Sequence, residues 1–379
     1  MAVALPSPPE TVLLEPPGAA ETTLLARGIV SAVRPPGGLT PLQALLLEAL
    51  FTSMTGHAVS PATAEPIEAA EFAAGLARRN LEFRTRIVQI MLLGEFVLAP
   101  IPREIAERVA VFADELGVAD DMIAVAEAYS SGALDLAAAD FARNGYLSAV
   151  DPARLRAVHA AALANSWGEV IDDAALAARW QSLGDLPVET LGRGVFDFYR
   201  DRGFVFPGLA GSAPPLLAQH DWVHVLSGYG TTLESELEVF AFMARSNDDP
   251  RAFSLLAMVV SLFETGYLAA GAGLFEADPG HLRGPGVALR LADAMRRGAL
   301  TTGSHDFLET DWFALAGRPV PVIRTEIGLV DKAGAAVLAG SAGPWQPGGI
   351  TAYQIGSARA QATAEERDYR PWAPDPARA

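Results

Sequence analysis

Residues 219–238 read QHDWVHVLSGYGTTLESELE, which has the pattern of two helices joined by a short break. His220 and His224 are four residues apart, so they lie on one face of a helix, one turn from each other. Asp221 is turned about 100° from His220 around the helix axis, so all three side chains can point into one pocket. The glycines of the GYG run end this helix, and Thr231 with Glu234 forms a capping box that starts a second helix.

These residue types favour a metal site. Glu236 lies in the first turns of the second helix, close enough to fold back towards the histidines. Two imidazoles with one or two carboxylates suit a divalent first-row metal, and the chain has no cysteine that could supply a thiolate. We therefore expect His220, Asp221, His224 and Glu236 to bind a divalent ion, left open among iron, cobalt, zinc and manganese. Asp221 and Glu236 are also the catalytic candidates.

Two other interpretations of the histidine pair are open on the spacing alone. An isolated His-Asp-x-x-His is also compatible with buried or helix-capping histidines that bind nothing. A phosphohydrolase of the HD type would need a further upstream histidine and a distant aspartate. The nearest upstream histidine is His159, in an alanine-rich segment, and no second motif accompanies it.

The rest of the chain also favours helices. Residues 39–129 have helical apolar spacing, with helices expected over 65–78, 80–97, 102–116 and 119–130. Residues 1–37 are rich in Pro, Gly and Glu and predict a flexible arm with a short helix near Leu24 to Val33. Pro319 to Val330 could form one short strand, and residues 331–379 predict an extended tail. The expected fold class is all-α.

The most apolar segment runs from Ala252 to Phe275 and is divided by Glu264 into pieces too short to span a bilayer. A helix that is apolar almost all round must be buried in protein, covered by a lipid tail or used for association. This predicts a lipid groove beside the metal, a homodimer, or both. The carboxylate of Glu264 needs a buried partner, either in the metal pocket or on Arg290.

Composition excludes some partners. The net charge is −17, and Lys332 is the only lysine. Such a surface repels phosphate backbones, so we expect no nucleic-acid partner. The N-terminus has no basic leader, which predicts a cytoplasmic protein, with peripheral contact to the inner membrane left open.

Several other polar residues have simpler structural interpretations. His305 and Asp306 precede an aromatic-acidic helix expected over Phe307 to Trp312, for which Ser304 or Asp306 is the expected cap, and His281 follows a turn sequence. Arg296, Arg297 and Arg324 could meet a carboxylate or phosphate, but solvated surface arginines are the commoner outcome. Residues 269–273, AAGAG, permit close helix packing.

The motif and its flanks resemble the coenzyme Q (ubiquinone) biosynthesis protein 4 family. The pattern His-Asp-x-x-His, three residues, Gly, seven residues, Glu matches that family's signature at His220, Asp221, His224, Gly228 and Glu236. Residues 186–193, LPVETLGR, resemble its helix entry together with the following Phe196 and Tyr199. Downstream, residues 296–298 and the stretch from Trp312 to Arg324 resemble its closing helices. The resemblance covers about residues 172–330.

A second resemblance concerns the N-terminal helices. Residues 101–129, IPREIAERVAVFADELGVADDMIAVAEAY, and the turn at Gly56 to Ser60 resemble the tellurite-resistance TerB-like helical fold. The acidic turn by which that fold often takes a metal is missing here, so no metal is expected there. The expected organisation is a flexible arm at 1–37, a TerB-like helical domain at 38–135, a metal- and lipid-binding helical domain at 150–330, and the tail.

The first resemblance implies an all-helical domain that binds a polyprenyl lipid or prenylated aromatic acid beside the metal. It suggests an enzyme, a metal-dependent oxidative decarboxylase or hydroxylase of a hydroxybenzoate-type acid in quinone or related biosynthesis. The alternative is a non-catalytic lipid-binding scaffold that organises a quinone biosynthesis complex. Two histidines and a carboxylate with open positions favour the enzyme, because non-haem iron oxygenases use this arrangement. Within the site we expect Glu236 to be a ligand and Asp221 to accept a histidine N–H.

Overall fold

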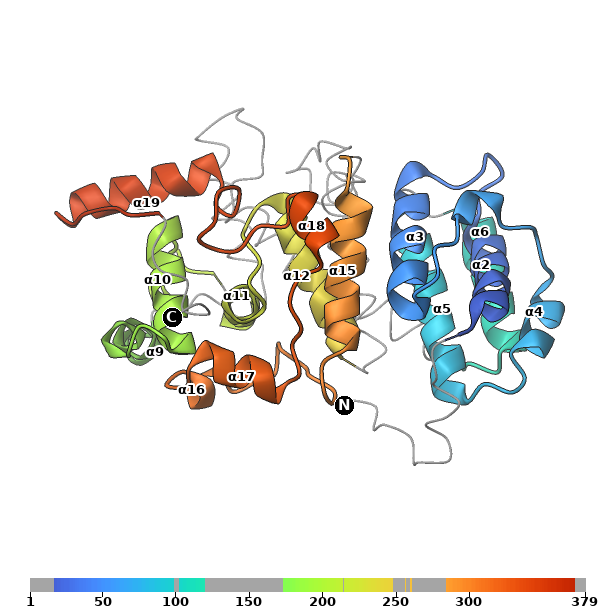
Figure 1. Ribbon diagram of the computed structural model, residues 1–379, viewed down its shortest axis with the longest axis horizontal. Coiled ribbons are helices and arrows are strands. Elements are labelled where there is room, and N and C mark those ends of the chain that lie inside the picture. The colour runs from blue at the N-terminus through green and yellow to red at the C-terminus, as the bar shows by residue number, and fades with distance from the viewer. Residues whose placement is uncertain are drawn as a thin grey trace.

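The structure is a computed structural model that describes residues 17–98, 102–119, 173–213, 215–247, 256, 260 and 284–371. Every regular element in these ranges is a helix, and their only strand-like pairing is an isolated bridge between Thr190 and Pro319. The expected all-α fold is therefore confirmed. Figure 1 shows an N-terminal bundle beside a second group of helices that contains the histidine motif.

The N-terminal bundle is built from amphipathic helices around an aliphatic core. Its elements are α2 (Ala19–Val33), α3 (Pro41–Thr55), the 3-10 turn η2 (Pro61–Thr63), α4 (Ala69–Gly75), α5 (Leu81–Phe96) and α6 (Arg103–Glu115). The helices expected over 65–78, 80–97 and 102–116 are thus present as α4, α5 and α6. The helix expected over 119–130 lies outside the described residues but for its first position.

One buried side chain ties three of these helices together. Thr40 and Gln43 form a capping box at the start of α3. The amide nitrogen of Gln43 also donates to the carbonyl oxygens of Val33, at 2.9 Å, and Gly94, at 2.8 Å. Because Gln43 is fully buried, these bonds fix α3 against the end of α2 and against α5.

The prediction of a flexible arm over residues 1–37 is wrong for its described part. The helix expected near Leu24 to Val33 begins already at Ala19 and is packed into the bundle. Leu25, Ile29 and Val33 recur every four residues and are all buried, so α2 presents a continuous apolar face to its neighbours. Residues 1–16 lie outside the described residues.

The second group surrounds the histidine motif. Its elements are α9 (Ala174–Gln181), the 3-10 turn η3 (Ser182–Asp185), α10 (Leu191–Arg202), α11 (Pro215–Ser227), α12 (Leu233–Ser246), α15 (Val287–Ala299), α16 (Trp312–Leu315), α17 (Val320–Glu326), α18 (Gly334–Leu338) and α19 (Ala352–Ala364). Helix α11 contacts α10, α12 and α17, so the motif lies in the interior of this group.

Helix α15 joins the two groups, since it packs against α12 on one side and α3 on the other (Figure 1). At the contact with α12, a Cβ on Gly298 would lie 2.3 Å from the carbonyl oxygen of Phe242, so the close approach requires glycine. The hydroxyl of Ser53 on α3 donates to the sulfur of Met295 on α15 at 3.5 Å. The N-terminal bundle is thereby attached to a helix that supports the histidine motif.

Two further predictions for the C-terminal part are wrong. Residues 320–326 form helix α17 and not a strand, because Pro319 has the extended conformation of an N-cap and Pro321 suits a first helical turn. The expected extended tail contains α18 and α19, and it buries Trp345 and Gln354. A capping box of Thr351 and Gln354 starts α19. The tail is therefore part of the packed structure up to α19.

The apolar segment from Ala252 to Phe275, Glu264 included, lies outside the described residues except for Leu256 and Val260. Both of these are helical and buried. Among the helices that the structure describes, none combines the length and apolar character needed to cross a bilayer. The expected lipid groove and dimer contact along this segment remain predictions.

Candidate metal centre

His220, Asp221 and His224 lie on α11 and are almost completely buried, with 0–1% of each residue exposed. One ligand atom from each lies within 4.8 Å of the others. Three potential ligands gathered in the interior of a helical domain could hold a metal ion. Three of the four predicted metal-site residues thus lie together on one helix, as their spacing indicated.

The turn after α11 brings a fourth residue to the group. Gly228 has a φ of 77°, which ends α11 in the left-handed region. A Cβ on Gly230 would lie 2.5 Å from the Cα atom of Gly349, so the turn packs directly on the C-terminal segment. Helix α12 then starts, with Glu236 in its first turn.

The cap of α12 differs by one residue from the predicted one. The side chain of Thr232, not Thr231, accepts from a backbone amide, that of Ser235 at 3.4 Å. The hydroxyl of Thr231 instead donates to the side-chain oxygen of Gln354 at 2.6 Å and accepts from Nε of Arg202 at 2.9 Å. Either threonine hydroxyl could cap the helix. Because the hydroxyl of Thr231 is bonded to Gln354 in the tail, Thr232 is the cap.

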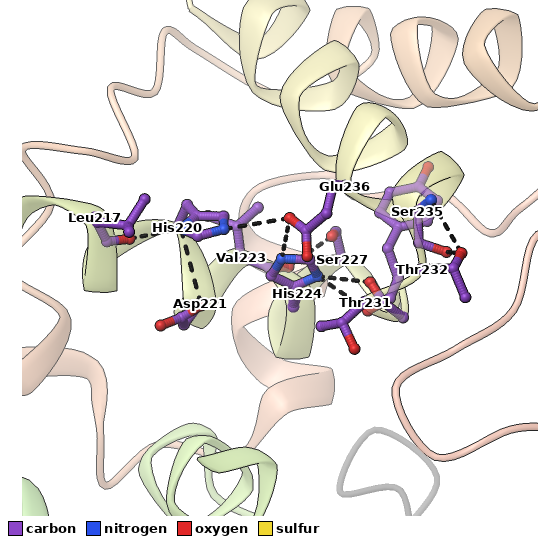
Figure 2. A network of polar contacts seen from close by, with 12 residues as sticks. Leu217, His220, Asp221, Val223, His224, Ser227, Thr231, Thr232, Ser235 and Glu236 are labelled. Atoms are coloured by element: carbon purple, nitrogen blue, oxygen red, sulfur yellow. Dashed lines mark hydrogen bonds and ion pairs between the residues drawn. The ribbon is translucent and has the colours of Figure 1, made fainter. Parts of the chain in front are cut away.

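Glu236 faces both histidines (Figure 2). Its Oε2 atom lies 3.3 Å from Nε2 of His220 and 3.1 Å from Nε2 of His224. Burial opposes ionisation of Glu236, but the charge of His224 and the hydrogen bonds from both imidazoles outweigh it, so its pKa is held below the ordinary range. The other carboxylate oxygen, Oε1, is buried and has no hydrogen-bond partner among the described residues.

Backbone carbonyls fix the orientation of both imidazoles. Nδ1 of His220 lies 2.5 Å from the carbonyl oxygen of Leu217, and Nδ1 of His224 lies 2.8 Å from that of Gly230. Because a carbonyl oxygen can only accept, each Nδ1 carries a proton and donates it. When the histidines are protonated, Nε2–H of each donates to Oε2 of Glu236. When they are neutral, as metal binding requires, both Nε2 atoms and Oε2 of Glu236 direct lone pairs at one another.

Asp221 approaches His220 from the opposite edge. Its Oδ1 atom lies 3.8 Å from Nδ1 of His220, farther than the 2.5 Å that separates Nδ1 from the oxygen of Leu217. The hydroxyl of Tyr199, on α10, donates to Oδ2 of Asp221 at 2.5 Å. The histidine N–H that we expected Asp221 to accept is therefore directed to Leu217, and Asp221 accepts from Tyr199.

Aromatic rings enclose the two imidazoles. Phe240 stacks on His220 and Phe198 on His224, each with ring centroids 5.3 Å apart. Tyr199 is itself packed between rings, parallel to Phe206 at 5.3 Å and beside Trp180 at 5.1 Å. These contacts restrict the rotation of the site residues and exclude water from them.

Arg202 connects the site to the C-terminal tail. It is buried, stacks on Phe198 and donates from Nη2 to the carbonyl oxygen of Pro344 at 2.7 Å. Burial lowers the pKa of Arg202 to about 10, while the charges of Asp201, Glu236 and Asp221 act in the opposite direction. The guanidinium therefore balances part of the carboxylate charge at the site.

Two functional neighbours, Tyr199 and Arg202, were missed as such from the sequence. Tyr199 entered only as part of a helix-entry pattern, and Arg202 did not enter at all. Both belong to α10, and neither has a fixed spacing from the histidines that would indicate contact. The carbonyls of Leu217 and Gly230 had no sequence signal, because their role depends on backbone geometry.

The remaining candidates lie elsewhere. Asp306 accepts from the amide of Leu308 at 3.0 Å within a turn, and His305 bonds the carbonyl oxygen of Thr302. The helix expected from Phe307 is wrong, because α16 begins only at Trp312 and is capped by Asp311. Arg297 is buried and Arg324 half-buried, and they donate to the carbonyl oxygens of Ser227 and Leu226 at the end of α11. His159, residues 269–273 and His281, which were interpreted from the sequence, lie outside the described ranges.

Comparison with protein-family models, with curated proteins and with solved structures found no match to this chain.

Proposed function

We propose that this protein is a metal-dependent oxidoreductase that exchanges the carboxyl group of a hydroxybenzoate-type acid, carrying a prenyl chain, for a hydroxyl group. The observation that carries the proposal is the convergence of three potential acceptor atoms: Oε2 of Glu236 lies 3.3 Å from Nε2 of His220 and 3.1 Å from Nε2 of His224. Three acceptors at hydrogen-bond distance repel one another unless a cation or protons lie between them.

The spacing of these atoms fits a shared ion. With metal–ligand bonds of about 2.1 Å, donors that share one ion at angles between a right angle and the tetrahedral angle lie about 3.0–3.4 Å apart. The unpartnered Oε1 of Glu236 and the fixed Nδ1–H groups fit the same interpretation, since ligating histidines almost always donate their other N–H. We therefore assign His220, His224 and Glu236 as ligands.

The ion would supply redox chemistry with dioxygen, for which iron, cobalt or manganese is suited and zinc is not. The protein residues would orient the reactants. Glu236 and the histidines leave coordination positions open, and Asp221, held by Tyr199, stays close enough to be a further ligand or to take a proton from a ring hydroxyl. The aromatic rings on both histidines exclude water.

The substrate class rests on the resemblance to the coenzyme Q biosynthesis protein 4 family. In the proposed reaction dioxygen supplies one oxygen atom to the ring, its other atom leaves as water, and the carboxyl group leaves as carbon dioxide. This stoichiometry requires two electrons from a reductant. The same proposal includes a homodimer and peripheral contact with a membrane that carries the prenylated substrate.

One observation favours the alternative, a lipid-binding scaffold with a structural metal. All four side chains of the site are buried, and structural metal sites are typically closed. A closed site with four protein ligands would hold α11 and α12 together without offering a position to substrate.

An experiment separates these functions. The apo-protein is loaded in parallel with Fe(II), Co(II), Mn(II) and Zn(II), and carbon dioxide release from a prenylated hydroxybenzoate is followed in air and without oxygen, with ascorbate as reductant. We expect oxygen-dependent release with a redox-active ion and none with zinc. Glu236→Gln should abolish it, and Glu234→Gln, on the same helix, serves as the matched control. If the protein is inactive with all four ions but still binds lipid tightly, the enzyme proposal is wrong and the lipid-binding scaffold is supported.

A further inference from the structure

A second group of buried polar atoms lies on the other side of α12. Within the described residues, five side-chain atoms in this region have no hydrogen-bond partner: Tyr229 Oη, Glu238 Oε1, Arg290 Nε, Arg297 Nη1 and Ser341 Oγ. Each residue is at least nine-tenths buried. Because buried polar atoms are nearly always partnered, such a concentration requires an explanation. We call these residues, with Lys332, the Tyr229 cluster.

The cluster is held in place by other bonds of the same side chains. Arg290 donates from Nη2 to Oε2 of Glu238 at 2.7 Å. Arg297 donates from Nε to the carbonyl oxygen of Val330 at 2.8 Å and from Nη2 to that of Ser227 at 2.9 Å. The positions of both guanidiniums are thus fixed, while one N–H edge of each stays without a partner.

Two cationic side chains, Lys332 and Arg297, lie against the ring of Tyr229. Nζ of Lys332 lies 4.4 Å and Cζ of Arg297 4.9 Å from the centre of its ring. Nζ of Lys332 donates to the carbonyl oxygen of Ala342 at 3.0 Å, which uses one of its three N–H groups. Arg297 lies beside the hydroxyl of Tyr229, but the two do not have the geometry of a hydrogen bond.

The charges of the cluster do not balance. Glu238 pairs with Arg290, and Asp293 pairs with Arg296 at 2.7 Å. Arg297 and Lys332 have no ion-pair partner among the described residues, and both lie against the Tyr229 ring. Proton donors without partners therefore outnumber acceptors, and the excess charge is positive.

We propose that Tyr229, Arg297 and Lys332 bind a small oxyanion, a carboxylate or phosphate group, at a site separate from the metal centre. An anion would accept from the hydroxyl, from Nη1 and from the ammonium group, in charge-assisted bonds that are stronger than neutral ones. The site is separate because Glu238 follows Glu236 by two residues, about 200° around α12, and faces α15 while Glu236 faces the histidines. The inference does not depend on the proposed function.

The anion site would also act on the metal centre through one residue. The carbonyl oxygen of Tyr229 lies 3.4 Å from Nδ1 of His224, next to the shorter contact with Gly230. A bound anion that fixes Tyr229 would therefore hold the backbone that orients His224. Removing the anion should therefore lower metal affinity, but by a smaller factor than replacing one of the metal ligands.

The test uses inorganic phosphate as the probe, the full chain, and chloride buffers of constant ionic strength. We expect saturable binding of one phosphate per chain by calorimetry and an upward shift of Tm of a few degrees. Acetate in a parallel titration distinguishes a carboxylate site from a phosphate site. Tyr229→Phe removes only the hydroxyl and should weaken binding about 10-fold, and Lys332→Met should weaken it by a similar factor.

Tyr353→Phe, an exposed tyrosine on α19, is the matched control and should bind as wild type. Folding of each variant is verified by circular dichroism. If neither phosphate nor acetate binds saturably, the proposal is wrong. Buried water molecules would then be the partners of these polar atoms. Equal binding by wild type, Tyr229→Phe and Lys332→Met would also overturn it, since the anion would then bind elsewhere.

Discussion

The two sides of helix α12 carry buried polar groups of opposite kinds. On one side, Glu236 meets two imidazole nitrogens, and all of these atoms are acceptors once the histidines are neutral. On the other side, Glu238 pairs with Arg290, and most of the polar groups in the Tyr229 cluster are donors. An excess of acceptors calls for a cation, and an excess of donors calls for an anion. Two glutamates two residues apart thus belong to sites with opposite requirements.

The comparison also shows what holds each side rigid. At the metal centre the carbonyls of Leu217 and Gly230 fix the imidazoles, and aromatic rings pack against them. In the Tyr229 cluster the carbonyls of Ser227 and Val330 fix Arg297. Backbone oxygens orient the charged groups in both places, so the positions depend on the fold and not only on the motif.

The largest expected effect is the loss of the metal when a ligand is removed. His224→Ala should lower metal affinity more than about 100-fold, because even groups that only support a ligand contribute 10- to 100-fold. The chain should remain helical. Metal content of the purified variant is the measurement, with His305→Ala as the control, since His305 lies outside the site. Equal metal content in wild type and His224→Ala would refute the assignment.

The next prediction tests whether the two sides are independent. Glu238→Gln breaks a buried ion pair and leaves Arg290 uncompensated, so it should cost about 3 kcal/mol of unfolding free energy. Metal affinity should change little. Urea unfolding and metal titration are the measurements. Glu326→Gln, which removes an exposed ion pair with Arg318, should cost less than about 1 kcal/mol.

Tyr199→Phe should have an intermediate effect on the metal centre. It removes the hydroxyl that donates to Asp221, so a buried carboxylate loses a charge-assisted bond. We expect metal affinity to fall about 10-fold and unfolding free energy by about 1–3 kcal/mol. Competition with a metal chelator measures the first and urea unfolding the second, with Tyr353→Phe as the control. Unchanged metal affinity would limit Tyr199 to a packing role.

The smallest effect concerns pH and the Tyr229 cluster. Burial lowers the pKa of Lys332 from 10.5 to about 7, and the charges that also act on it are those of Glu238, Arg297, Arg290 and Asp293. Between these two values the unfolded chain binds more protons than the folded one, so stability rises with pH.

Relative to Lys332→Met, wild type should gain about 1–2 kcal/mol from pH 7 to pH 9, a figure discounted for the partial exposure of the side chain. Urea unfolding in chloride buffers at both pH values measures the difference. A constant difference, or a smaller one at pH 9, would show that the amine is not desolvated in the folded state.

The sequence predicted the parts of the site that depend on local geometry. His220 and His224 share a face because they are four residues apart, and Glu236 returns to them because a glycine turn precedes its helix. The sequence could not distinguish Thr231 from Thr232 as the cap, since Gln354 decides this from far along the chain. Tyr199 was missed as a partner of Asp221 for the same reason.

The errors in the fold have a similar origin. Proline and glycine predicted a flexible arm over residues 1–37 and an extended tail over residues 331–379, yet Leu25, Ile29 and Trp345 are buried by contacts with distant elements. A short strand was expected within Pro319 to Val330, whereas Pro319 precedes the first turn of a helix. Periodicity indicated the longer helices correctly because their apolar faces repeat within a few residues.

The most direct test of the central claim, that Nε2 of both histidines and the carboxylate of Glu236 hold one ion, is X-ray absorption spectroscopy of the Co(II)-loaded protein. The arrangement predicts one ion per chain, two imidazole nitrogens at about 2.1 Å and oxygen in the remaining positions. His224→Ala should reduce the imidazole count to one at any residual site, and His305→Ala should leave the spectrum unchanged. An ion with no imidazole neighbours, or no stoichiometric ion at all, would contradict the account and leave Glu236 as the partner of protonated histidines.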